Sequence, residues 1–206
     1  MPASRANRPR RKAKQERSRE TVEIILEAAA RVLLDQGYGL ATTNRIAKKA
    51  GVSVGTLYEY FANKEAVFDA LIQNELSSLV EAFRGEKQNP TAPVDETISQ
   101  LLLAGMAAMR FGPELFRSLE QVPNASFRRH LADARQLVLR LIKQLLEGHR
   151  DELRVTDLDL AAFMVVSAAE GVAANATSEF FDERLAQEIA VLLKVYLTGA
   201  ETGGGV

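Results

Sequence analysis

Cysteine and tryptophan are absent from this chain of 206 residues, and histidine occurs only twice. Without cysteine there is no disulfide bridge, no thiolate metal ligand and no cysteine nucleophile. The two histidines, His130 and His149, are too few for an ordinary histidine-rich metal cluster. Both have arginine neighbours, which is typical of solvated helix residues and not of a catalytic base. The sequence therefore predicts no metal and no cofactor.

Signals of an enzyme or of a membrane segment are also missing. There is no glycine-rich phosphate loop before a helix and no HExxH zinc motif. No apolar run approaches the roughly 20 residues that span a bilayer, and the basic N-terminus lacks the apolar core of a signal peptide. We therefore expect a non-enzymatic, cytoplasmic protein with no membrane partner.

Charge is present but unevenly distributed. The net charge is −1, yet residues 1–65 carry 13 Lys and Arg against 7 Asp and Glu, whereas the remainder carries 13 against 20. The basic segment predicts an anionic partner near the N-terminus, and the acidic remainder predicts that the other end stays away from it. A chance imbalance with a solvated tail would give the same counts, so charge alone leaves both interpretations open.

Apolar residues recur at helical spacing along most of the chain, which predicts an all-α fold. Helices are expected over residues 18–36, 43–50, 54–61, 64–83, 94–109, 114–120, 125–149, 157–179 and 182–197. Residues 1–17 have many cations, two prolines and almost no large apolar side chain. They are predicted to be a disordered basic arm that either follows DNA phosphates or only aids solubility.

Residues 41–71, ATTNRIAKKAGVSVGTLYEYFANKEAVFDAL, have the pattern of two short helices joined by a tight turn. Thr43 is expected to N-cap the first helix and Ser53 the second, with Gly51 in the turn between them. Asn63 is expected to cap the next helix along the chain. This pattern is typical of a helix-turn-helix, whose second helix enters the DNA major groove.

The expected domains are built from these elements. Residues 18–73 form a helix-turn-helix DNA-binding head, residues 74–200 form a helical effector-binding and dimerisation domain, and residues 201–206 form a flexible tail. A polar, proline-containing break at residues 85–93 is the best candidate for a boundary between the head and the later helices.

The two C-terminal segments predict self-association. Residues 161–166 are apolar on every side of the expected helix, and residues 182–197 carry two adjacent apolar stripes. These helices could meet their symmetry mates in a four-helix interface, or both could be central in a monomer core. The dimer interface is expected at Val165, Ala169, Val172, Leu185, Ile189, Leu192 and Tyr196.

Residues 42–64 resemble the DNA-binding head of the tetracycline-repressor (TetR) family. The resemblance covers roughly residues 18–73 and is carried by Thr42-Thr43, Ile46-Ala47, Ala50-Gly51-Val52-Ser53, Gly55-Thr56-Leu57-Tyr58, Tyr60-Phe61 and Lys64-Glu65. It implies a homodimeric transcription regulator, usually a repressor, whose C-terminal domain binds a small effector. The alternative is a helical protein-interaction adaptor without specific DNA binding.

The resemblance also implies residue roles in binding a pseudo-palindromic operator of double-stranded DNA. The implied DNA contacts are Thr42, Thr43, Arg45, Ser53, Gly55, Thr56, Tyr58, Tyr60 and Lys64. Two residues depart from the family's pattern: Val54 stands where lysine is common, and Glu59 places an acid on the recognition helix. Glu59 could face cytosine, pair with Arg45 or point away.

The effector is expected to be a partly apolar small molecule. Methionine and phenylalanine shape adaptable apolar cavities, so they are the candidate pocket walls. The candidates are Leu102, Met106, Met109, Phe111, Phe116, Phe127 and Phe163, with Glu170, Asn175 and Arg110 as polar anchors. The function predicted is a repressor that leaves its operator when this effector binds.

Overall fold

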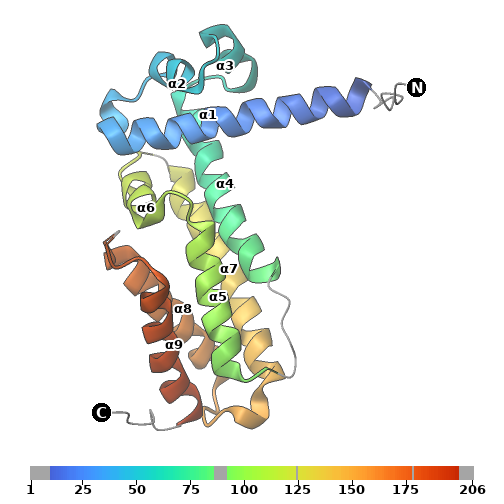
Figure 1. Cartoon of the computed structure of the whole chain (residues 1–206), viewed down its shortest axis with the longest axis vertical. Coiled ribbons are helices and arrows are strands. Elements are labelled where there is room, and N and C mark those ends of the chain that lie inside the picture. The colour runs from blue at the N-terminus through green and yellow to red at the C-terminus, as the bar shows by residue number, and fades with distance from the viewer. Residues whose placement is uncertain (1–9, 86–91, 124, 178, 200–206) are drawn as a thin grey trace, which may run out of the picture. The chain divides into compact units, whose positions relative to one another are not determined.

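The computed structural model describes residues 10–85, 92–123, 125–177 and 179–199. Within these ranges the chain forms nine α-helices, one short 3₁₀ turn and no strand, which confirms the all-α prediction (Figure 1). The chain folds as two compact units, Met1–Leu71 and Ile72–Val206. The division falls inside helix α4 (Lys64–Gly85) and not at the polar break after it. The predicted tail from residue 201 lies outside the described residues.

The first unit contains α1 (Arg10–Leu40), α2 (Thr43–Ala50), α3 (Val54–Tyr60) and the first turns of α4. Its core includes Ile25, Ile46, Leu57 and Phe68, all fully buried. These side chains come from all four helices, so the core fixes the angle between α2 and α3. Ile46 and Leu57, two residues of the helix-turn-helix motif, are therefore packing residues.

Helix α1 begins at Arg10, eight residues before the predicted start. The expectation of disorder is therefore wrong for residues 10–17, whose sequence is RRKAKQER. Alanine, arginine, lysine, glutamine and glutamate all have high helix propensity. Extending an existing helix also avoids the cost of nucleation, so no buried face is needed. Residues 1–9 of the predicted arm lie outside the described residues.

Helix caps in the head agree with the sequence except at one threonine. Thr42, not Thr43, caps α2, and its Oγ1 accepts a hydrogen bond from the Arg45 N–H at 3.3 Å. Ser53 caps α3 through the Thr56 N–H at 2.9 Å, and Asn63 accepts from the Ala66 N–H at 2.8 Å as predicted. Gly51 has the left-handed conformation expected of a glycine that ends a helix, with φ 70°.

The second unit is a bundle built from the rest of α4 and five further helices. These are α5 (Val94–Ala108), α6 (Gly112–Glu120), α7 (Ala125–Gly148), α8 (Leu158–Asn175) and α9 (Glu183–Thr198), with a 3₁₀ turn at Arg150–Glu152. Helix α5 packs mainly on α9, and α7 packs mainly on α8. The core of the bundle includes Ile98, Leu101, Ile142, Leu146 and Leu193.

Two details of this unit differ from the sequence prediction. Helix α8 ends at Asn175 instead of near residue 179; its start is capped by Asp157, whose carboxylate accepts from the Leu160 N–H at 3.0 Å. His149 is buried, not solvated, and its Nδ1 lies 2.8 Å from Glu152. Glu152 also accepts the Val94 N–H at 2.9 Å, and these two bonds hold the pKa of Glu152 below its ordinary value. His149 therefore helps anchor the start of α5.

Replacing Gly51 by alanine tests the turn between α2 and α3. Space is available for a Cβ at this position, so the expected loss comes from the left-handed backbone alone and amounts to about 1–2 kcal/mol in the free energy of unfolding. Gly39→Ala is the matched control, because Gly39 has equal space and no positive φ. Urea unfolding followed by far-UV circular dichroism measures both. Equal effects of the two substitutions would contradict this role of Gly51.

Candidate nucleic-acid interface and effector cavity

Helix α3 turns one side into the core of the head and the other outward. Leu57 is fully buried, whereas Val54, Gly55, Tyr58 and Glu59 are exposed. The outward side is therefore free to contact a binding partner. The residues on it come from the segment that the sequence predicts to read DNA.

Hydroxyl groups brace this outward side. The Thr43 and Tyr58 hydroxyls lie 3.1 Å apart and join the start of α2 to α3. The Ser53 and Thr56 hydroxyls lie 2.8 Å apart at the start of α3. The structure thus brings four of the predicted contact residues together in two pairs. Each pair orients side chains before any ligand arrives, which reduces the entropy lost on binding.

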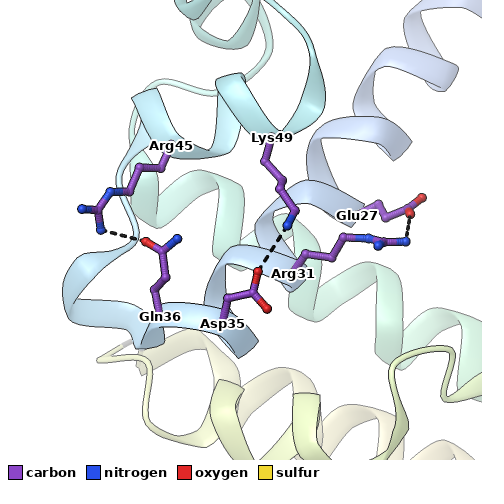
Figure 2. A network of polar contacts seen from close by, with 6 residues as sticks. All are labelled: Glu27, Arg31, Asp35, Gln36, Arg45 and Lys49. Carbon is purple, nitrogen blue, oxygen red and sulfur yellow. Dashed lines mark hydrogen bonds and ion pairs between the residues drawn. The ribbon is translucent and has the colours of Figure 1, made fainter.

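Two residues predicted to contact DNA, Arg45 and Lys64, bind groups of α1 in this structure. The Arg45 guanidinium donates to Gln36 at 2.8 Å and to the Leu40 carbonyl at 2.7 Å, so it ties α2 to α1 (Figure 2). Figure 2 also shows Lys49 reaching from α2 to Asp35 on α1, at 3.2 Å. The suggested pair between Arg45 and Glu59 does not form.

Lys64 has a comparable structural role at the start of α4. Its Nζ donates to the Tyr38 carbonyl at 3.1 Å and lies 3.8 Å from the centre of the Tyr38 ring. The same ring meets Phe68 edge-on, and its hydroxyl donates to Glu65 at 3.2 Å. Burial, followed by the charge of Glu65, raises the pKa of Tyr38. A contact between Lys64 and phosphate would therefore compete with this local cluster.

One exposed cation was missed in the sequence. Lys48 lies on α2, where neither an ion pair nor a side-chain hydrogen bond is formed with any described residue. Arg45 and Lys49 on the same helix are both engaged by α1. The signal in the sequence was the placement of Lys48 directly after the buried pair Ile46 and Ala47, which puts it on the solvent side of a short helix.

The second unit contains a cavity of about 480 Å³. Four of the predicted wall residues line it: Leu102, Met106, Met109 and Phe116. The other three, Phe111, Phe127 and Phe163, do not line it. Phe163 is exposed on α8, Phe127 is buried in helix packing, and Phe111 lies in the turn before α6. Helix α4 contributes Leu76, Leu79 and Phe83 to the wall, which was not predicted from the sequence.

Five residues predicted for the dimer interface also line this cavity. They are Val165, Ala169, Val172, Leu185 and Ile189. Tyr196 packs partly buried against the core, and only Leu192, which is 62% exposed, faces outward. Other apolar side chains make the outward surface of the two helices. We call this surface the α8–α9 outer face; it comprises Leu160, Phe163, Met164, Val191, Leu192 and Val195.

Charged groups at the cavity wall are largely neutralised by the protein itself. Arg135 binds Glu170 at 2.9 Å and Ser167 at 3.0 Å, so it joins α7 to α8. Arg117 donates to the carbonyls of Ala174 and Ala176 at the end of α8. Of the suggested anchors, Glu170 lines the cavity, whereas Asn175 and Arg110 do not. The remaining wall is almost entirely apolar, which favours an apolar ligand.

Helix α8 is long and apolar enough, by length and composition, to cross a membrane. Its 18 residues have a mean hydropathy of 1.3, and it is the single such helix among the described residues. Its inner side lines the cavity, and its outer side belongs to the α8–α9 outer face. A lone helix of this kind is typical of a protein core as well as of a membrane span, so it is weak evidence for a membrane.

Both units match known protein families. The family described as bacterial regulatory proteins, tetR family, matches residues 25–71, and the tetracyclin repressor-like C-terminal domain matches residues 93–197, about half of the chain. The HTH-type transcriptional regulator YhgD of Bacillus subtilis (strain 168) is 25% identical over 149 residues, which cover 70% of this chain and 78% of that protein.

Two further relatives are connected with fatty acids by name or by ligand. The fatty acid metabolism regulator protein of B. subtilis is 36% identical over 69 residues, which are 33% of this chain and 36% of that protein. The crystal structure of the transcriptional regulator FadR from B. subtilis in complex with stearoyl-CoA shares the fold, with a TM-score of 0.69 and 21% identity over 84% of this chain and 98% of that chain. The chain belongs to the TetR family and is a DNA-binding transcription regulator with a helix-turn-helix head and an effector-binding helical domain.

Proposed function

We propose that this regulator is a homodimeric repressor whose α3 enters the major groove and which an apolar effector releases from its operator. The observation that carries the proposal is the single helix α4. Lys64 begins it in the first unit, and Leu76, Leu79 and Phe83 line the cavity in the second. A ligand that moves the cavity wall therefore acts directly on a helix that continues into the DNA-binding head.

The proposed DNA contacts are those implied by the family resemblance, with one addition. Thr42, Thr43 and Lys64 bind phosphates, and the outward residues of α3 face the bases. Lys48 is added because it is exposed and makes no side-chain bond to a described residue. Selection of bound fragments from genomic DNA tests the function. Binding without any sequence preference at moderate salt would contradict it.

The proposed dimer uses the α8–α9 outer face. Six large apolar side chains are exposed on two neighbouring helices there, and one copy of this face can pack on another about a two-fold axis. Two heads would then meet half-sites whose centres lie about 34 Å apart, or a multiple of that. An adaptor without DNA binding is not favoured, because both units match a family of DNA-binding regulators.

The proposed effector is an elongated apolar molecule such as an acyl chain. The cavity volume of about 480 Å³ lies in the range of small-molecule sites. The structural relative FadR is in complex with stearoyl-CoA, which supports this class of effector.

Glu75 of α4 is buried, and burial raises its pKa while the charge of Arg110 opposes the rise. Because Arg110 lies in the turn after α5, its charge interaction with Glu75 links that turn to α4. We further propose a cytoplasmic location and no catalytic activity.

Lys64→Ala tests the phosphate contact. Loss of one cation per chain is expected to weaken binding to all sequences and to make the plot of log K against log salt concentration shallower by about 0.9 per contact. Fluorescence anisotropy over a salt series measures it. Lys49→Ala is the matched control, because Lys49 pairs with Asp35 and is not a proposed contact. An unchanged slope in a folded Lys64 variant would refute the contact.

Leu192→Asp tests the dimer. A carboxylate buried at the centre of an apolar interface without a partner costs several kcal/mol, so the variant should be monomeric at micromolar concentration and lose most of its operator affinity. Sedimentation velocity measures the mass. Ile24→Asp, at a 48% exposed apolar site on α1, should remain dimeric. A dimeric Leu192 variant would place the interface elsewhere.

Met106→Trp tests the cavity, because the larger side chain fills space that the effector needs. Stearoyl-CoA and stearate, as probes, should raise the melting temperature of the wild-type chain by several degrees and release it from the operator. The variant should bind the operator within about twofold of wild type and show neither response. Phe111→Leu, outside the cavity wall, should respond normally. If neither probe acts on the wild-type chain, an acyl effector is excluded.

A further inference from the structure

The recognition helix lacks the side chains that most often read bases. From its cap to its last residue it reads Ser53, Val54, Gly55, Thr56, Leu57, Tyr58, Glu59 and Tyr60. Arginine and lysine bind guanine in a bidentate manner, and asparagine and glutamine bind adenine in the same way. None of these four residue types occurs on α3. Its one charged group, Glu59, is an acceptor. Base discrimination by α3 must therefore use other contacts.

Two side chains dominate its outward surface. Val54 is 37% exposed and Tyr58 is 51% exposed, and their spacing of four residues places them on one face of the helix. Gly55 adds no side chain beside them, and a Cβ there would meet only the Ser53 Oγ, at 3.6 Å. The hydrogen bond between the Thr43 and Tyr58 hydroxyls holds the aromatic ring in place. The outward side of α3 thus presents a branched aliphatic group next to an oriented ring.

The major groove offers a single apolar group to such a surface. Guanine, cytosine and adenine present only donors and acceptors there, whereas thymine also presents its C5 methyl group. An exposed valine alone is ordinary on a protein surface. Its position at the start of the groove-binding helix, where no cation or amide competes for the bases, gives it a specific partner.

We propose that Val54 reads the methyl group of a thymine in each operator half-site and is a specificity-determining residue of this regulator. The proposal rests on the entry of α3 into the major groove. It explains how the head discriminates bases although α3 cannot make bidentate contacts. It also gives a role to the apolar residue where the family commonly has lysine.

The test replaces the thymines of a selected operator one at a time by deoxyuridine, which lacks only the C5 methyl group. The full-length wild-type chain should lose about fourfold in affinity at one thymine of each half-site, which corresponds to about 0.8 kcal/mol for one buried carbon. In Val54→Ala this loss should shrink to less than twofold at that thymine. Losses at other thymines should not change.

Combining the base change with the Val54→Ala change distinguishes a methyl contact from an effect of uracil on DNA shape, because only a methyl contact makes the loss of affinity depend on Val54. Ile24→Ala is the control, since it removes an exposed apolar side chain from α1 and should keep the full fourfold loss. If no thymine shows a loss that depends on Val54, the assignment is wrong. If the wild-type chain selects no specific sequence at all, the proposed function itself fails, and this result is distinct from the first.

Discussion

The continuity of helix α4 is the constraint on which the rest of the molecule depends. The two compact units divide between Leu71 and Ile72, yet these residues are consecutive in one helix that runs from Lys64 to Gly85. Each backbone N–H in a helix bonds to the carbonyl four residues before it, so a helix bends little without breaking such bonds. Buried residues lie on both sides of the division, for example Phe68 before it and Leu76 after it. Any rearrangement of one unit must therefore be accommodated by the same helix in the other.

Within the head, several cationic side chains stabilise contacts between helices. Arg45, Lys49 and Lys64 each bind a group on α1, so the basic character that indicates DNA binding also fastens α2 and α4 to α1. These contacts are exposed or half-buried, and each contributes little stability alone. Together they position α2 and α3 before DNA is met. A regulator of this kind must have a rigid reading surface, because a groove contact requires side chains to be held in place.

Helices α8 and α9 are apolar on two sides for two different reasons. The inner residues, such as Val165 and Ile189, line the cavity, and the outer residues, such as Phe163 and Leu192, are exposed. Arg135 lies between these surfaces, since it binds Glu170 at the cavity and lies 5.3 Å from the ring of Phe163. One side chain, Arg135, therefore contacts residues of both surfaces.

The sequence alone determined the features that depend on local physics. Helical spacing predicted the all-α class, Gly51 predicted the left-handed turn, and Ser53 and Asn63 predicted their caps, because each needs only neighbouring backbone atoms. The structure decided what local chemistry leaves open, including which of two like residues caps a helix and how a helix is rotated about its axis. Thr42 and Thr43 have the same cap chemistry, and only the extended backbone at Thr42 selects it as the cap. Likewise, the apolar stripe containing Val165 and Ile189 could face either a partner or the interior. A helix with apolar residues on two sides does not encode which side packs inward; its neighbours in the fold do.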